Sequence, residues 1–198
     1  MSNALKLHIG CGRTRLNGFV NIDAIDNVDL TLDVDSAALP FPDSSVDFVF
    51  SFHAMEHFNN YLFVLGEIWR VMKHGAVFMM QVPYVTLSEY NLINPFHRTH
   101  FNEFSFDFFD PSKLKNSANE QTPVVFKKHW HRFHYMPEFQ LTPEPERTYA
   151  RRHYFNVVRA IDFGLTAVKG GEQVSRDLPN PDALMNVLIQ EVESSRQD

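Results

Sequence analysis

The chain has 198 residues, of which 44% are hydrophobic, and a formal net charge of -6. This length suits one domain, residues 1–198, and the apolar content is enough to form a buried core. The acidic balance argues against nucleic acid or anionic membrane as partners, since both favour basic surfaces. No apolar run approaches the roughly 20 residues that span a bilayer. Cys11 is the only cysteine, so no intrachain disulfide can form, and we expect a cytoplasmic protein.

The first half of the chain alternates short apolar runs with turns. Four runs predict strands, and apolar residues spaced by three and four then predict a helix that leads into a fifth strand. Strands joined by helical connectors form a parallel sheet with both faces covered. The expected strands lie at 5–9, 19–25, 29–34, 46–52 and 76–82. The expected helix has its apolar residues over 62–72 and ends at Gly75.

The second half is less regular. Residues 84–125 follow no repeat and hold several turn formers and a cluster of phenylalanines, which predicts an insertion after the fifth strand. Two late strands are expected at 124–135 and 156–168, with a proline-bearing loop at 137–145 between them. A last helix is indicated by an apolar stripe made of Leu184, Val187, Leu188 and Val192.

The connection between the first two strands is unusually short. Only residues 11–18 separate them, whereas parallel neighbours normally need a crossover of about a dozen residues or more. A full helix does not fit there. We therefore expect a bare loop or a single turn. Such a short connection leaves one flank of any ligand site at the end of the first strand thinly covered.

Glycines and carboxylates stand at the ends of the first three predicted strands. Gly10 and Gly12 follow the first strand, Asp23 lies near the end of the second, and Asp33 near the end of the third. Glycine lets the backbone approach a ligand closely, and open parallel sheets bind nucleotides at the carboxyl ends of their strands. A carboxylate on the neighbouring strand can accept hydrogen bonds from ribose hydroxyls. Each residue alone fits a plain turn, but their order along successive strands predicts a nucleotide-type site.

Four segments in this order resemble the class I S-adenosylmethionine-dependent methyltransferases. They are LHIGCG, GFVNID, LPFPDSSVDFVFSFHAMEH and EIWRVMKHGAVFMMQVP, and they cover roughly residues 5–83. They are especially similar to a group of short methyltransferases of type 11. The segments at 94–101 and, more faintly, 156–169 are similar to the same group.

The resemblance implies an α/β fold with a Rossmann-like, doubly wound, mostly parallel seven-stranded sheet. It also implies S-adenosyl-L-methionine across the ends of the first four strands: the glycine turn backs the methionine part, Asp23 holds the ribose, residues 33–35 border the adenine, and residues 51–53 close the methyl-bearing end. The cofactor-binding residues expected on this basis are His8, Gly10, Cys11, Gly12, Ile22, Asp23, Asp33, Val34, Asp35, Ser51, Phe52 and His53.

Two positions depart from the pattern of the family. Many members have an acidic residue where His8 stands and a third glycine where Thr14 stands. The acidic residue usually helps to fix the amino-acid end of the cofactor. The departures therefore keep open a second hypothesis, a non-catalytic protein of the same fold that binds the cofactor weakly or acts as a partner subunit.

Histidines supply the candidate catalytic groups. His97 and His100 lie in the insertion and His53 follows the fourth strand, and a histidine has a pKa suited to a general base. The run from His53 to His57 also matches H-x-x-E-H, a zinc-hydrolase pattern that requires one continuous helix. Because this run directly follows a buried strand, we expect no metal there and expect Glu56 and His57 to begin the helix.

These observations favour a methyltransferase that acts on a small-molecule acceptor, for example a sugar or a lipid precursor. The insertion at 84–125 is expected to cover the acceptor. An NAD-dependent oxidoreductase is disfavoured because G-x-G-x-x-G is absent and Asp23 follows Gly12 by too few residues. The acceptor and the oligomeric state stay open at this point.

Overall fold

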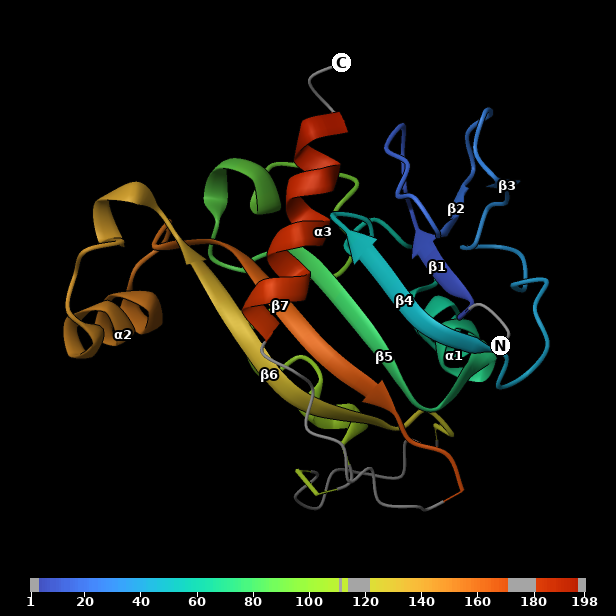
Figure 1. Ribbon diagram of the computed structural model, residues 1–198. Coiled ribbons are helices and arrows are strands. Elements are labelled where there is room, and N and C mark those ends of the chain that lie inside the picture. Colours follow the sequence, from blue (N-terminus) through green and yellow to red (C-terminus); the bar gives the residue numbers. More distant parts are fainter. Residues whose placement is uncertain (1–3, 111, 114–121, 171–180, 196–198) are drawn as a thin grey trace.

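A computed structural model describes residues 4–110, 112–113, 122–170 and 181–195. Its seven strands form one sheet in the order β3-β2-β1-β4-β5-β7-β6 (Figure 1). The strands are β1 (Lys6–Ile9), β2 (Val20–Asp23), β3 (Leu30–Thr31), β4 (Val46–Phe52), β5 (Met72–Pro83), β6 (Phe126–Tyr135) and β7 (Val158–Ala167).

The pairing confirms the predicted fold class. β3, β2, β1, β4 and β5 are parallel neighbours, while β7 pairs antiparallel with both β5 and β6. The sheet is therefore mixed but mostly parallel. All seven strands overlap the segments predicted from the sequence, and β3 is much shorter than expected, at two residues.

The first crossover contains no helix, as predicted. Residues 10–19 form turns between two parallel strands. The face that this missing helix leaves open is covered by α3 (Pro181–Ser195), which lies across the sheet in Figure 1. Its contacts form a separate apolar cluster made of Leu16, Phe50, Phe52, Met79, Met185, Leu188 and Val192. A helix from the far end of the chain thus takes the place of a local one.

The opposite face of the sheet carries the larger core. The helix α1 (Tyr61–Val71) packs there through Val64, Leu65 and Ile68, all at most 1% exposed. Phe101 and Phe106 from the insertion belong to the same core. The aromatic residues of the insertion thus pack against the sheet, which fixes this segment beside it.

Three boundaries differ from those predicted. The helix ends at Val71 rather than at Gly75, because β5 begins at once and Gly75, with φ +74°, lies inside that strand. The second helix, α2 (Glu144–His153), was not predicted; it starts within the expected proline loop. In α3 the buried stripe is Met185, Leu188 and Val192, while Leu184 and Val187 are 40% and 50% exposed.

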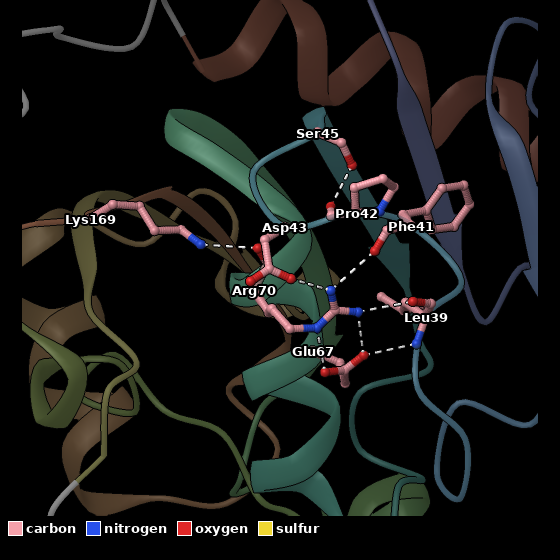
Figure 2. A network of polar contacts seen from close by, with 8 residues as sticks. All are labelled: Leu39, Phe41, Pro42, Asp43, Ser45, Glu67, Arg70 and Lys169. Atoms are coloured by element: carbon pink, nitrogen blue, oxygen red, sulfur yellow. Dashed lines mark hydrogen bonds and ion pairs between the residues drawn. The ribbon is translucent and has the colours of Figure 1, made fainter.

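A polar network fixes the connector before β4 (Figure 2). Arg70 of α1 donates hydrogen bonds to the carbonyl oxygens of Leu39 (2.9 Å) and Phe41 (3.0 Å) and forms ion pairs with Glu67 and Asp43. Glu67 in turn accepts from the Leu39 amide (2.9 Å). This network lies at the start of β4, at the opposite end of the strand from the glycine turn, so it serves the fold.

Candidate active site

The glycine turn after β1 is held by the backbone of the neighbouring strand. The amides of Gly10 and Cys11 both donate to the carbonyl oxygen of Ile22, at 2.9 and 3.1 Å. Gly10 and Gly12 adopt positive φ angles of 65° and 56°, which glycine takes at no steric cost. A Cβ at Gly12 would meet nothing within 4 Å, so the turn presents open space. This space is what a ligand needs if it is to contact the backbone.

Asp23 lies beside this turn at the end of β2. Its Oδ2 accepts a hydrogen bond of 2.7 Å from the amide of Gly12, which ties the two strand ends together. Cys11 is buried in the same turn. Burial, and then the charge of Asp23, raise the pKa of its thiol to about 11, so Cys11 is a neutral thiol and not a nucleophile at neutral pH.

A cavity of about 360 Å³ opens at this turn, and we call it the glycine-turn cavity. Six of the predicted cofactor residues line it: Gly10, Cys11, Gly12, Asp23, Phe52 and His53. The sequence did not single out the remaining lining residues, Arg13, Thr14, Ala54, His57 and Phe58, as cofactor contacts. The predicted glycine and acidic positions are thus brought together at one strand-end edge.

The other predicted cofactor residues do not line this cavity. His8, Ile22 and Ser51 are buried inside their strands, and His8 Nδ1 lies 3.1 Å from Asn21 Oδ1. Val34 is part of the main core. Asp33 accepts from Ser36 within its own turn, and Asp35 accepts from the amides of Asn59 and Asn60 ahead of α1. The roles of these residues toward a cofactor stay predictions.

The chain turns sharply at the end of β4. His53 has φ +51°, a strained conformation for a residue with a side chain, and its amide still donates to the Gln81 carbonyl oxygen of β5 (2.9 Å). Residues 53–60 form turns, and α1 begins only at Tyr61. Glu56 and His57 therefore do not begin the helix as predicted, and the H-x-x-E-H run lacks the continuous helix of a zinc hydrolase.

A second cavity, of about 450 Å³, lies on the other side of His53 and is called the insertion cavity. Phe52, His53 and His57 line both cavities, so the two adjoin at the end of β4. The remaining lining residues are Glu56, Gln81, Pro83, Leu87, Tyr90, His97, Arg159, Ala160 and Glu193. They come from the turn after β4, from β5, β7 and α3, and from the insertion.

The insertion is attached to this edge at two places. The amide of Arg98 donates to the Glu56 carbonyl oxygen (2.7 Å), which brings His97 next to the turn after β4. Further along, the Tyr84 hydroxyl donates to Glu103 (2.7 Å), and Arg151 of α2 forms a buried ion pair with the same carboxylate. Burial alone would raise the pKa of Glu103, but these two partners hold it below its usual value.

The two predicted histidines of the insertion differ in position. Nδ1 of His97 and Nδ1 of His100 lie 3.1 and 3.3 Å from the same acceptor, Oδ1 of the buried Asn91. His97 lines the insertion cavity, whereas His100 does not and is exposed. Burial lowers the pKa of His97, which favours the neutral ring. Of the three candidate bases, the structure places His53 and His97 at the cavity.

Polar residues inside β5 and β7 support His53 from behind. His53 Nε2 lies 3.1 Å from Gln81 Oε1, and the Gln81 amide donates to Asp162 (2.7 Å), which is fully buried. The sequence analysis missed both Gln81 and Asp162. A polar residue within an otherwise apolar strand run, as in MMQVP and AIDFG, is the signal that could have found them.

An open, mostly parallel sheet with a nucleotide-type cavity at its strand ends defines a Rossmann-like class of protein. Comparison with known proteins agrees. Residues 21–80 match the model of a family described as "Methyltransferase domain". A probable S-adenosylmethionine-dependent methyltransferase of Mycolicibacterium smegmatis is 38% identical over 69 residues, which are 33% of this chain and 27% of the relative. The matched region thus spans about a quarter of that relative.

Solved structures show the same fold over most of the chain. A methyltransferase that is described as putative, in complex with the Trm112 activator of Haloferax volcanii, matches with a TM-score of 0.55 and 16% identity, covering 86% of this chain and 85% of the other. The YcgJ protein from Bacillus subtilis matches with a TM-score of 0.53 and 14% identity, covering 85% and 94%. The fold of the chain is therefore that of the class I S-adenosylmethionine-dependent methyltransferases, and residues 21–80 match a methyltransferase domain.

Of the helices in the described ranges, none has the length and apolar character to cross a bilayer.

Proposed function

We propose that the chain binds S-adenosyl-L-methionine in the glycine-turn cavity and transfers its methyl group to a small molecule held in the insertion cavity. The observation that carries this proposal is the shared wall of the two cavities, made of Phe52, His53 and His57. A donor on one side of this wall and an acceptor on the other would meet at the end of β4. Catalysis by placement in this way needs two adjoining pockets.

The residues of the glycine-turn cavity fit the cofactor. The open space at Gly12 allows close approach to the backbone, and the Asp23 carboxylate stands where ribose hydroxyls can donate to it. A Cβ at Gly10 would lie 2.2 Å from the Cβ of Ala54, so the turn also packs closely against the segment after β4. When bound, the cofactor supplies an activated methyl group on a sulfonium.

The chain's own residues would then place the acceptor and accept its proton. His53 stands at the junction, and its ring is fixed by Gln81. His97 lines the acceptor side and is held neutral by burial, the form in which a base accepts a proton. The insertion, β5, β7 and Glu193 of α3 contribute the remaining walls.

The chemistry of the insertion cavity supports a small polar acceptor. Tyr90 and Leu87 offer apolar contact, while Arg159 and Glu193 supply one charge of each sign. Such a mixed lining suits a sugar or a polar lipid precursor. A volume of about 450 Å³ lies within the usual range of roughly 300–1,000 Å³ for small-molecule sites.

The test is a thermal shift measured in parallel with S-adenosylmethionine, S-adenosylhomocysteine and NAD. A ligand at a hundredfold excess over its Kd should stabilise the chain by ~2.7 kcal/mol. We expect a shift with both adenosyl compounds and none with NAD. Equal shifts with all three, or no shift with either adenosyl compound, would contradict the proposed cofactor. With binding established, candidate acceptors are screened by release of S-adenosylhomocysteine.

A second candidate function is a partner subunit of the same fold. It is favoured by the departures at His8 and Thr14, since His8 faces Asn21 inside the sheet and presents nothing to the cavity. The Haloferax volcanii methyltransferase is seen in complex with an activator protein. If cofactor binding appears only after a partner protein is added, the chain is dependent on that partner.

A further inference from the structure

Three side chains with metal-binding atoms converge at the floor of the insertion cavity. In the described part of the chain, Glu56, His57 and His97 form the one group of three whose ligand atoms all lie within 4.8 Å of one another. All three line the insertion cavity. The rings of His57 and His97 meet edge to face, with centroids 4.7 Å apart. Residues from two separate segments thus face a common point.

Glu56 has an unsatisfied oxygen at this point. The residue is 1% exposed, and its Oε2 has no hydrogen-bond partner. A buried carboxylate without full compensation is costly, and such groups are paired or coordinate a metal. Its other oxygen, Oε1, lies 3.3 Å from His53 Nδ1 and 4.0 Å from His57 Nε2. The two contacts leave Oε2 available for a cation.

His53 does not occupy the free oxygen of Glu56. Its Nδ1 lies 3.3 Å from Oε1, and its Nε2 lies 3.1 Å from Gln81 Oε1. Both ring nitrogens of His53 therefore contact oxygens other than Oε2, which has no hydrogen-bond partner.

The spacing is close to that of a metal site. Zinc binds imidazole nitrogen and carboxylate oxygen at about 2.0–2.2 Å, which places tetrahedral ligand atoms about 3.4 Å apart. The present atoms lie up to 4.8 Å apart, so small side-chain rotations bring them to that spacing. The Arg98 amide bonded to the Glu56 carbonyl oxygen keeps His97 within reach.

We propose that Glu56, His57 and His97 bind one divalent metal ion of the zinc class, with an open coordination position that faces the insertion cavity. Two imidazoles and a carboxylate suit zinc and neighbouring transition metals, not calcium or magnesium. Three protein ligands with one free position are typical of a site that also binds a small molecule. A metal-bound His97 takes up no proton, so with the metal in place His53 is the base of the proposed transfer, and an oxygen or nitrogen of the acceptor takes the open position. This set differs from the H-x-x-E-H pattern because His97 comes from the insertion, 40 residues further along.

The metal site is independent of the proposed function, since it can be measured without cofactor or acceptor. Untagged full-length protein is freed of metal with a chelator and titrated with Zn²⁺ in competition with a chromophoric chelator. Co²⁺ is titrated separately and followed by its visible absorption, which reports a four-coordinate nitrogen and oxygen environment. We expect one metal ion per chain. Elemental analysis gives the stoichiometry.

Variants test the three ligands. His57→Ala, His97→Ala and Glu56→Gln should each weaken Zn²⁺ binding at least about 100-fold, because even the loss of an outer-shell partner costs about 10–100-fold. His100→Ala is the matched control: His100 contacts the same Asn91 from the same segment but lies outside the group, so its affinity should stay within about threefold of wild type. Circular dichroism checks that each variant is folded.

Two results would overturn the proposal. One is a wild-type protein that holds less than half an equivalent of zinc at micromolar free Zn²⁺. The other is folded His57→Ala and His97→Ala variants that bind zinc as tightly as wild type. A failed metal test leaves the thermal shift with S-adenosylmethionine unaffected, so the two proposals can fail separately.

Discussion

The two adjoining cavities are built in different ways. The glycine-turn cavity rests on the ends of neighbouring strands and on residues of one short stretch, Gly10 to Asp23, with the segment after β4 as its far wall. The insertion cavity takes its lining from the end of β4 and the turn after it, from β5, β7 and α3, and from the insertion, with residues as far apart as His53 and Glu193. Local backbone geometry defines the first, and long-range packing of side chains defines the second. A substitution outside the shared wall of Phe52, His53 and His57 should therefore disturb one cavity and spare the other.

The largest effect is expected on the acceptor side, from loss of the buried ion pair at Glu103. Glu103→Gln leaves Arg151 buried without its counter-charge, and breaking a buried pair in this way typically costs about 3–5 kcal/mol. Chemical unfolding should show this loss, with Glu138→Gln, an exposed position, as the control. Cofactor affinity of the folded variant should be unchanged, and a parallel loss of affinity would show that the cavities are coupled.

The same residue predicts a dependence of stability on pH. Because the folded-state pKa of Glu103 is held below its ordinary value of about 4.3, its contribution is complete above that value and is lost as the pH falls through the lower folded-state pKa. Wild type should lose free energy of unfolding below about pH 4 more steeply than Glu103→Gln. If wild type and Glu103→Gln lose free energy of unfolding identically as the pH falls, ionisation of Glu103 is not the cause of the acid destabilisation.

On the cofactor side, Gly12→Val should abolish tight binding of S-adenosylmethionine. The new side chain would project into open space in the glycine-turn cavity, where the ligand is proposed to bind, and the positive φ at Gly12 adds backbone strain. We expect at least about a 100-fold loss of affinity by calorimetry, equivalent to ~2.7 kcal/mol. Gly75→Val is a matched control, because Gly75 also has positive φ and open space but lies at the far end of β5. It should lose stability without losing affinity.

Asp23→Ala should have a smaller effect on the same cavity. A charge-assisted hydrogen bond is worth about 1.5–3 kcal/mol, so we expect a loss of affinity of tenfold or more. The variant also removes the acceptor of the Gly12 amide, which loosens the turn. Asp26→Ala, on the exposed turn beyond β2, serves as the control. An affinity equal to that of wild type would place the ribose elsewhere.

The smallest effect is expected from His100→Ala. The ring is exposed and lies outside both cavities, so turnover with an identified acceptor should fall by less than about threefold. His97→Ala, at the cavity wall, should reduce turnover strongly while leaving cofactor affinity in place. The ratio of the two turnover numbers shows whether His97, and not His100, contributes to turnover. Equal losses would mean that the insertion acts only as a structural cover.

The sequence predicted the sheet and the glycine turn because both depend on local patterns. An apolar run followed by Gly10-Cys11-Gly12 implies a buried strand and a tight turn whatever surrounds it. The sequence could not predict that His97 lies beside Glu56, because that contact depends on a hydrogen bond from the Arg98 amide to the carbonyl oxygen of Glu56, 42 positions earlier. The sequence analysis also assigned Val187 to the buried stripe of α3, whereas Met185 faces the sheet and Val187 faces outward. Apolar spacing alone left the helix rotation undetermined.

The replacement of the first crossover helix by α3 has a consequence for how the protein is made. Synthesis proceeds from the amino end, so all seven strands are translated before residues 181–195 emerge. Until then the nascent chain carries Phe50, Phe52 and Met79 without their cover, since Met185, Leu188 and Val192 complete that cluster. Exposed apolar surface of this kind promotes aggregation and chaperone binding. The face that lacks a local helix is therefore covered only after all seven strands have been translated, when residues 181–195 have emerged.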